Sequence, residues 1–582
     1  MRIVRTIVVP MGLLLAMFSS CSKKATSGGG GGNNPNPPPT DSNYNPVDPP
    51  PAASIGFFLN GWQPKTFTAP ATVAGPVFSG SLSDTLTINV NNVITKVSPY
   101  VFGNNSNLWS GQFVTEPVLM QYMKDLSPNI IRGPGGSISD VYFWNDTSAG
   151  PADAPAQLLD ANGTPSSSPP YWFGGNTASW TFTLSNYYNL LAQTNSTGII
   201  TINYGYARYG TGPNPVAAAA HLAADWVRHD NGRTKYWEIG NENYGNWEAG
   251  YLIDQTKNKD GQPSTITGNV YGNHVKVFAD SMRAAATQIG ATIYIGATLE
   301  DSPPYNGAYQ SLVTWNQGVL STAGSTVDFF IVHDYFTAYN ANSTPADILS
   351  TANTIPAAGM SYVKQQIATA GLSMKPVALT EWNIQAVGSK QDVSYVAGMH
   401  AAKTIGSIIR NQFGEASRWD MANGWSGGDD MGLFNHGDEP GAPLWNPRPA
   451  FYYLYYFQKL FGDRMVKDTL AAINGDLTTY SGTFTSGQAG TVVINSGTSV
   501  HNLGINFQHF PAGSKYYWYV LTGGTDNGSF SGQVYVNGTG PSTATGGQLN
   551  YASLKAYSAP LTGMIRLTVP PMSVIYLVAD KK

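Results

Sequence analysis

The sequence predicts an α/β protein, a (β/α)8 TIM barrel followed by a C-terminal antiparallel β-sandwich. Strand-like and helix-like segments alternate eight times across residues 96–461, a pattern typical of a barrel of parallel strands. From residue 462 onward the helical period is lost, and short runs of alternating polar and apolar residues replace it. Two glutamates, Glu242 and Glu381, each stand just after an apolar strand-like run, where the reactive groups of such barrels lie.

Length and composition limit the class of protein further. A chain of 582 residues with 42% hydrophobic content can bury a large core and should form two or more domains. Only 11% of the residues are charged and the net charge is −4, so the chain has no broad cationic surface and nucleic acid is not an expected partner. Aromatic residues make up 12% of the chain, which suits a surface that binds neutral, hydroxyl-rich ligands.

The first residues have the pattern of an export signal. Arg2 and Arg5 precede an apolar run at 7–18, which is too short to span a membrane and ends in small residues before Cys21. This predicts a lipoprotein-type signal peptide over 1–21, with Cys21 as the lipid attachment point of an exported bacterial lipoprotein anchored on the periplasmic side or at the cell surface. Plain secretion with a coincidental cysteine remains an alternative. Because Cys21 is the only cysteine, disulfides and cysteine-based metal sites are excluded.

Two segments separate the signal from the barrel. Residues 22–52 are rich in Gly, Asn and Pro and contain five consecutive glycines, which predicts a disordered linker acting as a tether. Residues 53–95 include a strand-like run at 85–94, which we expect to join the β-sandwich before the chain enters the barrel.

The elements of the barrel follow in order. The third helix is Ala-rich with apolar residues at helical spacing, and Gly290 ends the fourth. The barrel strands are expected at 100–104, 129–132, 199–203, 235–239, 292–295, 328–333, 376–380 and 417–421. The helices are expected at 116–126, 186–194, 216–229, 274–289, 310–320, 360–370, 393–411 and 449–460. The strands of the sandwich are expected at 491–495, 516–521, 534–537, 564–569 and 573–578.

The two glutamates fall on opposite sides of one predicted cleft. Glu242 follows strand four and Glu381 follows strand seven. A double-displacement glycosidase places two carboxyls about 5 to 5.5 Å apart, one as nucleophile and the other as acid and then base. Such a pair needs different surroundings, because the nucleophile must be ionised while the acid must carry a proton.

Four segments carry a resemblance to a known family. Residues 240–247, Gly-Asn-Glu-Asn-Tyr-Gly-Asn-Trp, resemble the strand-four signature of the retaining clan A glycoside hydrolases, and especially of the α-L-arabinofuranosidase family 51. The segments 132–136 (Arg-Gly-Pro-Gly-Gly), 202–205 (Ile-Asn-Tyr-Gly) and 333–335 (His-Asp-Tyr) are similar to that family's strands two, three and six. The similarity extends from about residue 93 to 576.

The resemblance implies a role for several residues. Glu242 would be the acid/base, Glu381 the nucleophile, and Asn241 a donor to the sugar 2-hydroxyl. Arg132 and Tyr335 would hold the carboxylate of Glu381 in its charged form.

Further substrate contacts are expected nearby. Asn203 would line the site, and His333 would contact substrate or the acid/base. From the residues alone, the alternatives are that His333 is a core histidine and that Arg132 forms a structural ion pair. The candidate stacking platforms for sugar rings are Trp144, Trp172, Trp247, Trp382, Trp419 and Trp425.

Several points stay open at the level of sequence. The strand-eight contact of family 51 has no clear counterpart among residues 418–425, and the inserts at 146–179 and 337–356 could build a closed pocket or an open groove. The substrate could therefore be an arabinofuranoside, or a β-glucan or xylan cleaved by an endo-acting enzyme of the same clan. A non-catalytic glycan-binding lipoprotein, and an esterase using the Gly-x-Ser-x-Gly motif at 424–428, are the alternatives from other classes. No cofactor and no metal site are expected, since no His-Glu-x-x-His occurs.

Overall fold

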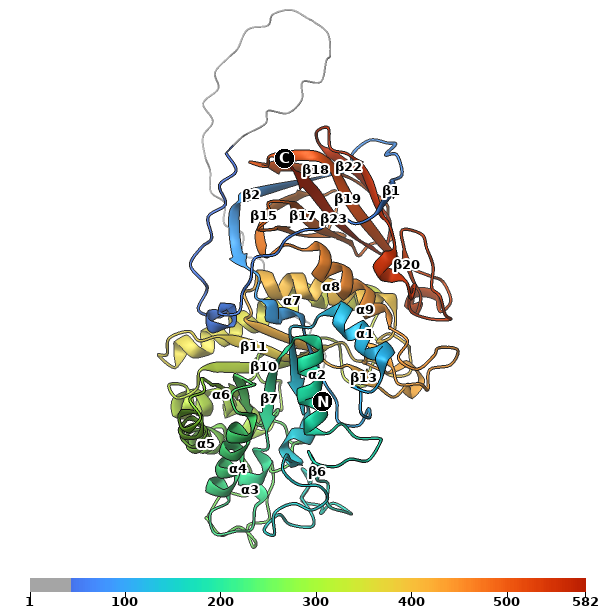
Figure 1. The fold of residues 1–582 in the computed structure, drawn as a ribbon. Coiled ribbons are helices and arrows are strands. Elements are labelled where there is room, and N and C mark those ends of the chain that lie inside the picture. The colour runs from blue at the N-terminus through green and yellow to red at the C-terminus, as the bar shows by residue number, and fades with distance from the viewer. Residues whose placement is uncertain (1–42) are drawn as a thin grey trace, which may run out of the picture.

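The computed structural model describes residues 43–582, so Cys21, the expected signal peptide and most of the expected linker lie outside the described residues. The described chain forms a barrel with a β-sheet domain above it (Figure 1). None of the helices within residues 43–582 combines the length and the apolar character needed to cross a bilayer.

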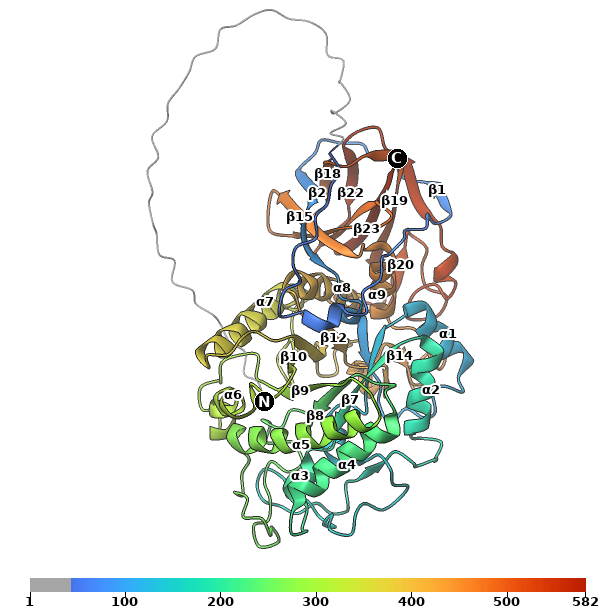
Figure 2. The same ribbon diagram turned by 60° about the vertical axis from the view of Figure 1, so that its left-hand side comes forward.

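Eight parallel strands close into the barrel, as the sequence predicts. Helices surround it, and Figure 2 shows α4 and α5 along the outside of β7, β8 and β9. The barrel strands are β3 (Gly103–Asn105), β4 (Ile130–Gly133), β7 (Thr197–Ile202), β8 (Tyr236–Ile239), β9 (Tyr294–Thr298), β10 (Phe329–Tyr335), β11 (Val377–Asn383) and β12 (Glu415–Arg418). The α-helices are α1 (Pro117–Leu126), α2 (Leu184–Thr194), α3 (Gly205–Tyr209), α4 (Pro215–Asp230), α5 (Gly268–Gln288), α6 (Gln310–Ala323), α7 (Pro345–Thr369), α8 (Tyr395–Arg410) and α9 (Pro449–Leu460).

Among the elements that differ from the sequence prediction, two do so for clear local reasons. The first strand is short because Pro99–Phe102 forms a 3-10 helix, η2, whose N-terminus is capped by the hydroxyl of Ser98. Helix α7 begins at Pro345, well before the predicted residue 360, because Thr344 caps its first turn and Pro345 fits the first helical position. Pro356 lies inside this helix, where a proline normally predicts a break.

The second domain is a curled, mixed sheet of eleven strands. All neighbouring pairs are antiparallel except β1 with β21 and β2 with β18. Strand β2 (Asp84–Lys96) precedes the barrel in the chain and pairs with both β15 and β18. The other strands are β1 (Thr72–Ala74), β15 (Arg464–Ala471), β16 (Leu477–Thr483), β17 (Ala489–Asn495), β18 (His501–Gln508), β19 (Ala512–Gly523), β20 (Val534–Val536), β21 (Ala556–Pro560), β22 (Ile565–Val569) and β23 (Ser573–Lys581).

The end of the predicted linker is fixed to the sheet domain. Asp48 accepts two hydrogen bonds from the guanidinium of Arg464, at 2.5 and 3.0 Å, and lies 3.2 Å from Lys96. Tyr44 packs against the apolar core of the sheet. The prediction of a disordered linker is therefore wrong for residues 43–52.

A short segment closes the N-terminal end of the barrel. The 3-10 helix η1 (Gly56–Leu59) inserts Phe58 among side chains from the first residues of several barrel strands, including Ile130 and Phe329. Its neighbour Phe57 stacks on Tyr294 at a ring distance of 3.9 Å. Because this end is filled by apolar packing, the opposite end is left for polar side chains.

Replacing Phe58 by alanine should weaken the barrel without touching its polar end. Phe58 is 0% exposed, and truncating a buried phenylalanine costs about 3 to 5 kcal/mol. We expect a loss of this size in the free energy of unfolding, measured in urea, and no loss from Val77→Ala, since Val77 is 91% exposed. Equal stability of the two variants would show that η1 does not close the barrel.

Candidate active site

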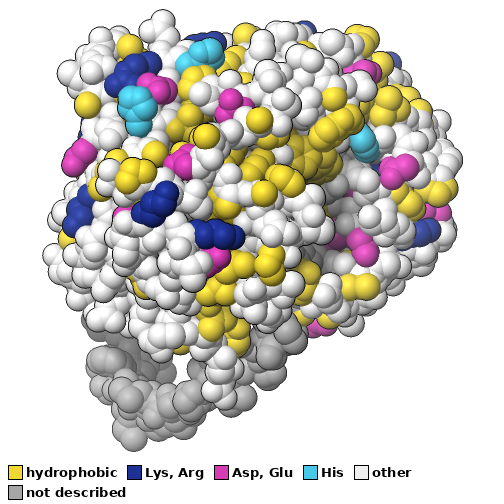
Figure 3. Space-filling model, turned by 90° about the horizontal axis from the view of Figure 1, so that it is seen from below, with side chains coloured by type: hydrophobic (Ala, Val, Ile, Leu, Met, Phe, Trp, Pro, Cys, Tyr) yellow, Lys and Arg dark blue, Asp and Glu magenta, His cyan; other side chains and the backbone are white. Residues whose placement is uncertain are grey.

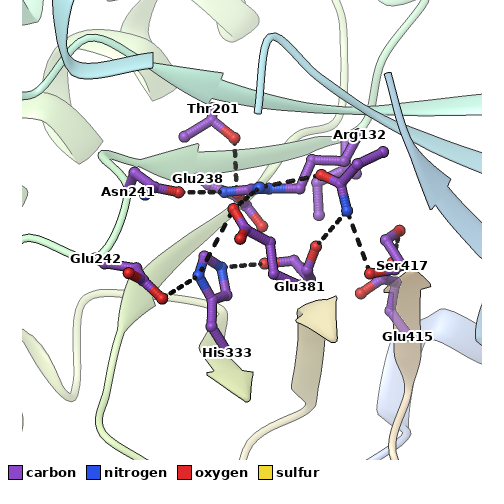
Figure 4. Close-up of polar contacts among 12 residues, drawn as sticks. Arg132, Thr201, Glu238, Asn241, Glu242, His333, Glu381, Glu415 and Ser417 are labelled. Atoms are coloured by element: carbon purple, nitrogen blue, oxygen red, sulfur yellow. Dashed lines mark hydrogen bonds and ion pairs between the residues drawn. The ribbon is translucent and has the colours of Figure 1, made fainter. Parts of the chain in front are cut away.

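The two predicted glutamates meet at the C-terminal end of the barrel. Glu242 lies in the loop after β8, Glu381 lies on β11, and His333 on β10 stands between them (Figure 4). One oxygen of each carboxylate and one ring nitrogen of His333 all lie within 4.8 Å of one another. Residues far apart in the sequence thus form one compact cluster.

Glu381 is held by two donors. The Arg132 Nη1 donates to its Oε1 at 2.8 Å, and the Tyr335 hydroxyl donates to its Oε2 at 2.8 Å. Burial raises the pKa of Tyr335 well above its ordinary value, and the negative charges of Glu381 and Glu242 raise it further, so the hydroxyl keeps its proton. The carboxylate of Glu381 is therefore fixed at both oxygens beside a permanent positive charge.

Arg132 is the centre of this arrangement. Burial alone would lower its pKa, but Glu238 and Glu381 together raise it above its ordinary value. Its Nε donates to Glu238 Oε2 at 2.5 Å, its Nη1 also donates to Asn105 Oδ1 at 3.1 Å, and its Nη2 donates to Asn241 Oδ1 at 2.9 Å. One guanidinium thus joins strands β3, β4 and β11 to β8 and the loop after it.

Glu242 has different surroundings. Its Oε1 lies 3.1 Å from His333 Nδ1, and its Oε2 accepts a hydrogen bond from the Trp247 indole at 3.0 Å. His333 is fixed in turn by Thr380, whose hydroxyl lies 2.9 Å from Nε2. The Glu242 side chain is 16% exposed, against 5% for Glu381. The more exposed carboxyl can exchange protons with solvent and ligand, while the buried one is held against a cation.

Two further buried carboxyls lie beside this pair, and neither was predicted from the sequence. Asp140, in the 3-10 helix η3 (Ser137–Val141), accepts hydrogen bonds from the backbone of Gly205 and Asn241, and burial raises its pKa to about 7. Glu248 accepts from Asn241 Nδ2 at 2.9 Å, and its pKa is raised well above the ordinary value by burial and by the charges of Asp140 and Glu242.

Two other partners were missed in the sequence. Asn105 on β3 donates to the backbone carbonyl of Thr380 and accepts from Arg132. Glu238 lies on β8, where an acidic residue inside an apolar strand is a signal that a buried cation must face it.

Two of the predicted aromatic residues lie at the site. Trp247 is 50% exposed and bonds to Glu242. Trp419 packs against the turn after β4, where a side chain at Gly136 would come within 2.6 Å of its ring. Gly136 also has a φ of 64°, so both the close approach and the backbone require glycine there.

Other predicted residues have structural partners instead. Trp382 is 1% exposed and packs near Phe336 in the apolar core, so its ring has little open surface for a sugar, and stacking there stays a prediction. Trp144 donates to the carbonyl of Leu222 on α4 and stacks on Trp226.

The remaining three predicted contacts also lie among protein groups. The amide of Asn203 bonds to Tyr142, Tyr206 and Tyr209. Trp172 packs edge-on against Trp180, and the Arg448 guanidinium lies 5.5 Å from the ring of Trp425. Direct contact of these three with substrate stays a prediction.

The cluster of Glu242, His333 and Glu381 has the atom types of a metal site, although the sequence contains no metal motif. Both ring nitrogens of His333 already have partners, and both oxygens of Glu381 accept hydrogen bonds. A divalent cation would have to displace these bonds beside the charge of Arg132. The arrangement therefore favours paired carboxyl chemistry over metal binding.

Comparison with known proteins shows which proteins share this fold. No family model matches the chain. A curated relative, an intracellular exo-α-(1→5)-L-arabinofuranosidase of Acetivibrio thermocellus, is 23% identical over 293 residues, which cover 47% of this chain and 50% of that protein. The match thus spans about half the length of the relative.

Solved structures match over a longer part of the chain. The α-L-arabinofuranosidase of Thermotoga maritima, in complex with arabinose, aligns with a TM-score of 0.59 and 16% identity over 85% of this chain and 99% of that one. A bifunctional glucanase-xylanase from a metagenome library aligns with a TM-score of 0.55 and 14% identity over 86% and 100%. A family 44 xyloglucanase of Paenibacillus polymyxa aligns with a TM-score of 0.53 and 12% identity over 86% and 100%.

The barrel with its appended sheet is thus of the class found in glycoside hydrolases. Within that class, the chain resembles the family 51 α-L-arabinofuranosidases in fold.

Removing the charge of Arg132 should destabilise the barrel by leaving two buried carboxylates unpaired. We expect Arg132→Met to lower the free energy of unfolding by about 3 to 5 kcal/mol. The double variant Arg132→Met/Glu238→Gln should recover part of this loss, because one uncompensated charge is gone. Urea unfolding measures both, and a double variant no more stable than the single one would contradict the assigned ion pair.

Proposed function

We propose that this protein is a retaining glycoside hydrolase of the α-L-arabinofuranosidase type, with Glu242 as acid/base and Glu381 as nucleophile. The observation that carries this proposal is the approach of the two carboxylates to within 4.8 Å. Retaining enzymes place these groups about 5 to 5.5 Å apart, and inverting enzymes about 6.5 to 9.5 Å. This approach fits the retaining arrangement, in which Glu381 itself attacks the sugar.

The first step forms a covalent intermediate. A carboxylate oxygen of Glu381 bonds to the anomeric carbon as the bond from that carbon to the leaving oxygen breaks. The proton of the Glu242 carboxyl passes to the leaving oxygen. Glu381 is then esterified to the sugar, and Glu242 is ionised.

The second step releases the sugar with its original configuration. Glu242 accepts a proton from a water molecule, whose oxygen bonds to the anomeric carbon while the bond to Glu381 breaks. Glu242 regains its proton and Glu381 its negative charge. Arg132 and Tyr335 hold Glu381 in place in both steps and stabilise the carboxylate as it leaves.

The proposed substrate is a neutral oligosaccharide or polysaccharide. Figure 3 shows one face of the molecule, on which hydrophobic side chains gather around a hollow and charged side chains are scattered singly. Trp247, exposed and bonded to Glu242, offers a flat surface beside the cleaved bond. The named activities of the relatives in fold and sequence favour an arabinofuranoside.

A second candidate is an endo-acting β-glycanase, because a glucanase-xylanase and a xyloglucanase share the fold. A panel of aryl α-L-arabinofuranosides, aryl β-xylosides and polymeric glucans separates the two. Release of single arabinose units supports the first candidate, and internal chain cleavage supports the second.

The alternatives from other classes have less support. A non-catalytic binding protein has no need of two carboxylates set against different partners at this distance. For an esterase, Ser426 would have to lie between a strand and a helix, yet it starts a three-residue 3-10 turn, η4 (Ser426–Gly428), with a kink at Gly427.

The proposed location is an exported lipoprotein anchored through Cys21. Its support is the sequence of residues 1–21 alone. Since Tyr44 and Asp48 contact the sheet domain, the tether in this proposal is confined to residues 22–42. Metabolic labelling with a fatty acid tests it: label is expected on the wild type and not on Cys21→Ser.

Glu381→Gln should abolish hydrolysis of an activated aryl arabinofuranoside. The amide keeps the shape of the side chain but cannot attack the anomeric carbon, so we expect a loss of kcat on the order of 10⁴-fold or more. NMR of the first product should show retained configuration with the wild type. Inverted product would refute double displacement, and full activity of Glu381→Gln would refute the assigned nucleophile.

The activity lost in Glu242→Ala should depend on how strongly the leaving group of the substrate needs a proton. We expect a large loss on substrates with poor leaving groups and a much smaller loss in glycosylation by a dinitrophenyl glycoside, whose leaving oxygen needs no proton. Azide should restore turnover by attacking the intermediate and give a glycosyl azide of retained configuration. Equal losses on both substrates, with no azide product, would contradict the acid/base role.

A further inference from the structure

A pair of buried carboxyls lies behind the proposed acid/base and has no role in the two steps above. Asp140 is fully buried in η3, and Glu248, in the loop after β8, is 3% exposed. Neither forms an ion pair within the described chain. A buried carboxylate without a cation is costly unless donors surround it or a proton neutralises it.

The two carboxyls differ in the number of donors they receive. Asp140 accepts from the backbone N–H of Gly205 at 3.0 Å and of Asn241 at 3.3 Å, and from Asn243 Nδ2 at 2.7 Å. These bonds occupy both of its oxygens.

Glu248 is bonded through one oxygen only. Its Oε1 accepts from the Ser137 hydroxyl at 2.8 Å and from Asn241 Nδ2 at 2.9 Å. Its Oε2 is buried and has no hydrogen-bond partner. Burying an ionised oxygen that receives no hydrogen bond costs far more free energy than burying a protonated one. The proton of the neutral acid is therefore placed on Oε2.

Asn241 connects this carboxyl to the reacting groups. Its backbone N–H bonds to Asp140, its Nδ2 to Glu248, and its Oδ1 accepts from Arg132. With Oδ1 and one Nδ2 hydrogen engaged, the side-chain amide can take only one orientation. The second Nδ2 hydrogen is left for a ligand hydroxyl.

We propose that Glu248 acts as a neutral carboxylic acid and positions Asn241, so that the amide donates to a sugar hydroxyl next to the cleaved bond. The inference rests on the proposed glycosidase function and deepens it. Glu248 is a positioning residue, because it acts on the substrate only through Asn241. Its neutrality also keeps another negative charge away from Glu242 and Asp140, the titratable groups that face it.

The pKa of Glu248 agrees with this role, since burial and the charges of Asp140 and Glu242 raise it well above the ordinary value. The guanidinium of Arg132 lies beyond Asn241. Its positive charge is already paired with the carboxylates of Glu238 and Glu381.

Two variants distinguish a neutral Glu248 from an ionised one. Glu248→Gln keeps an acceptor oxygen and zero charge, so kcat/KM should stay within about threefold of the wild type and its alkaline limb should not move. Glu248→Met keeps the volume but offers no oxygen to Asn241, and we expect a loss on the order of 10- to 100-fold. On a substrate lacking the 2-hydroxyl, the loss from Glu248→Met should shrink to a few-fold.

These outcomes can overturn the proposal. If Glu248 were ionised, Glu248→Gln would remove a negative charge beside Glu242 and shift the alkaline limb of kcat/KM to lower pH. A loss with Glu248→Gln as large as with Glu248→Met would also refute the neutral acid. Wild-type activity in Glu248→Met, or an equal loss on the deoxy substrate, would refute the positioning of Asn241. The control Glu116→Gln removes a carboxylate at the N-terminus of α1, which has no assigned role in the reaction, and should keep wild-type kcat/KM.

Thermal unfolding tests the neutral state without any activity. An acid whose folded pKa is raised contributes its full stability below its unfolded pKa of about 4.3, and this stability is lost as pH rises toward the folded pKa. Glu248→Gln cannot lose it, so its melting temperature should rise relative to the wild type between about pH 5 and pH 8. Glu116→Gln is melted alongside to correct for the change in net charge. A difference for Glu248→Gln that does not grow with pH would overturn the proposal, whereas an inactive wild type would overturn only the glycosidase function.

Discussion

The polar end of the barrel depends on one buried cation, the guanidinium of Arg132. A charge taken out of water is stable only if it is paired and fully hydrogen-bonded. Glu238 and Glu381 supply the opposite, negative charges. Asn105 and Asn241 supply the other hydrogen-bond acceptors. Because these four side chains come from different strands or the loops that follow them, the ion pair fixes both the barrel and the site. The nucleophile proposed for catalysis is thus also a structural partner.

The scaffold around this cation is rigid on both sides. At the N-terminal end of the barrel, the aromatic side chains of η1 pack against the barrel strands and fill the opening. Above, the sheet domain shares one apolar core with the barrel, and the Tyr576 hydroxyl on β23 donates to the carbonyl of Tyr453 on α9. Strand β2 ties the two parts together, because it pairs inside the sheet and leads directly into η2 and β3. Such a support can hold two carboxylates at a fixed separation while a ligand binds.

The sequence predicted the parts of this site that follow local rules. Glu242 and Glu381 stand at strand ends, and strand ends can be read from apolar runs. Helix α7 was expected only from residue 360, but it begins at Pro345 and runs through Pro356, where a proline normally predicts a break. Residues 43–52 were misread because their low apolar content hides the ion pair of Asp48.

Other features of the site depend on contacts between distant segments. Asp140 and Glu248 are joined by Asn241, which donates to both, and no spacing in the chain marks this. Trp382 was expected to face a ligand, yet its ring is largely buried, because neighbouring residues on a strand point to opposite faces. With Glu381 turned into the barrel, its neighbour must point into the surrounding core.

In the proposed double displacement, Glu381 attacks the sugar while Glu242 donates and then accepts the proton. The most direct measurement is to trap the covalent intermediate with a 2-deoxy-2-fluoro glycoside bearing an activated leaving group, digest the protein, and locate the label by mass spectrometry. We expect one sugar per chain, attached to the peptide that contains Glu381. A label on the peptide that contains Glu242, or turnover of the activated substrate with inversion and no covalent adduct, would contradict it.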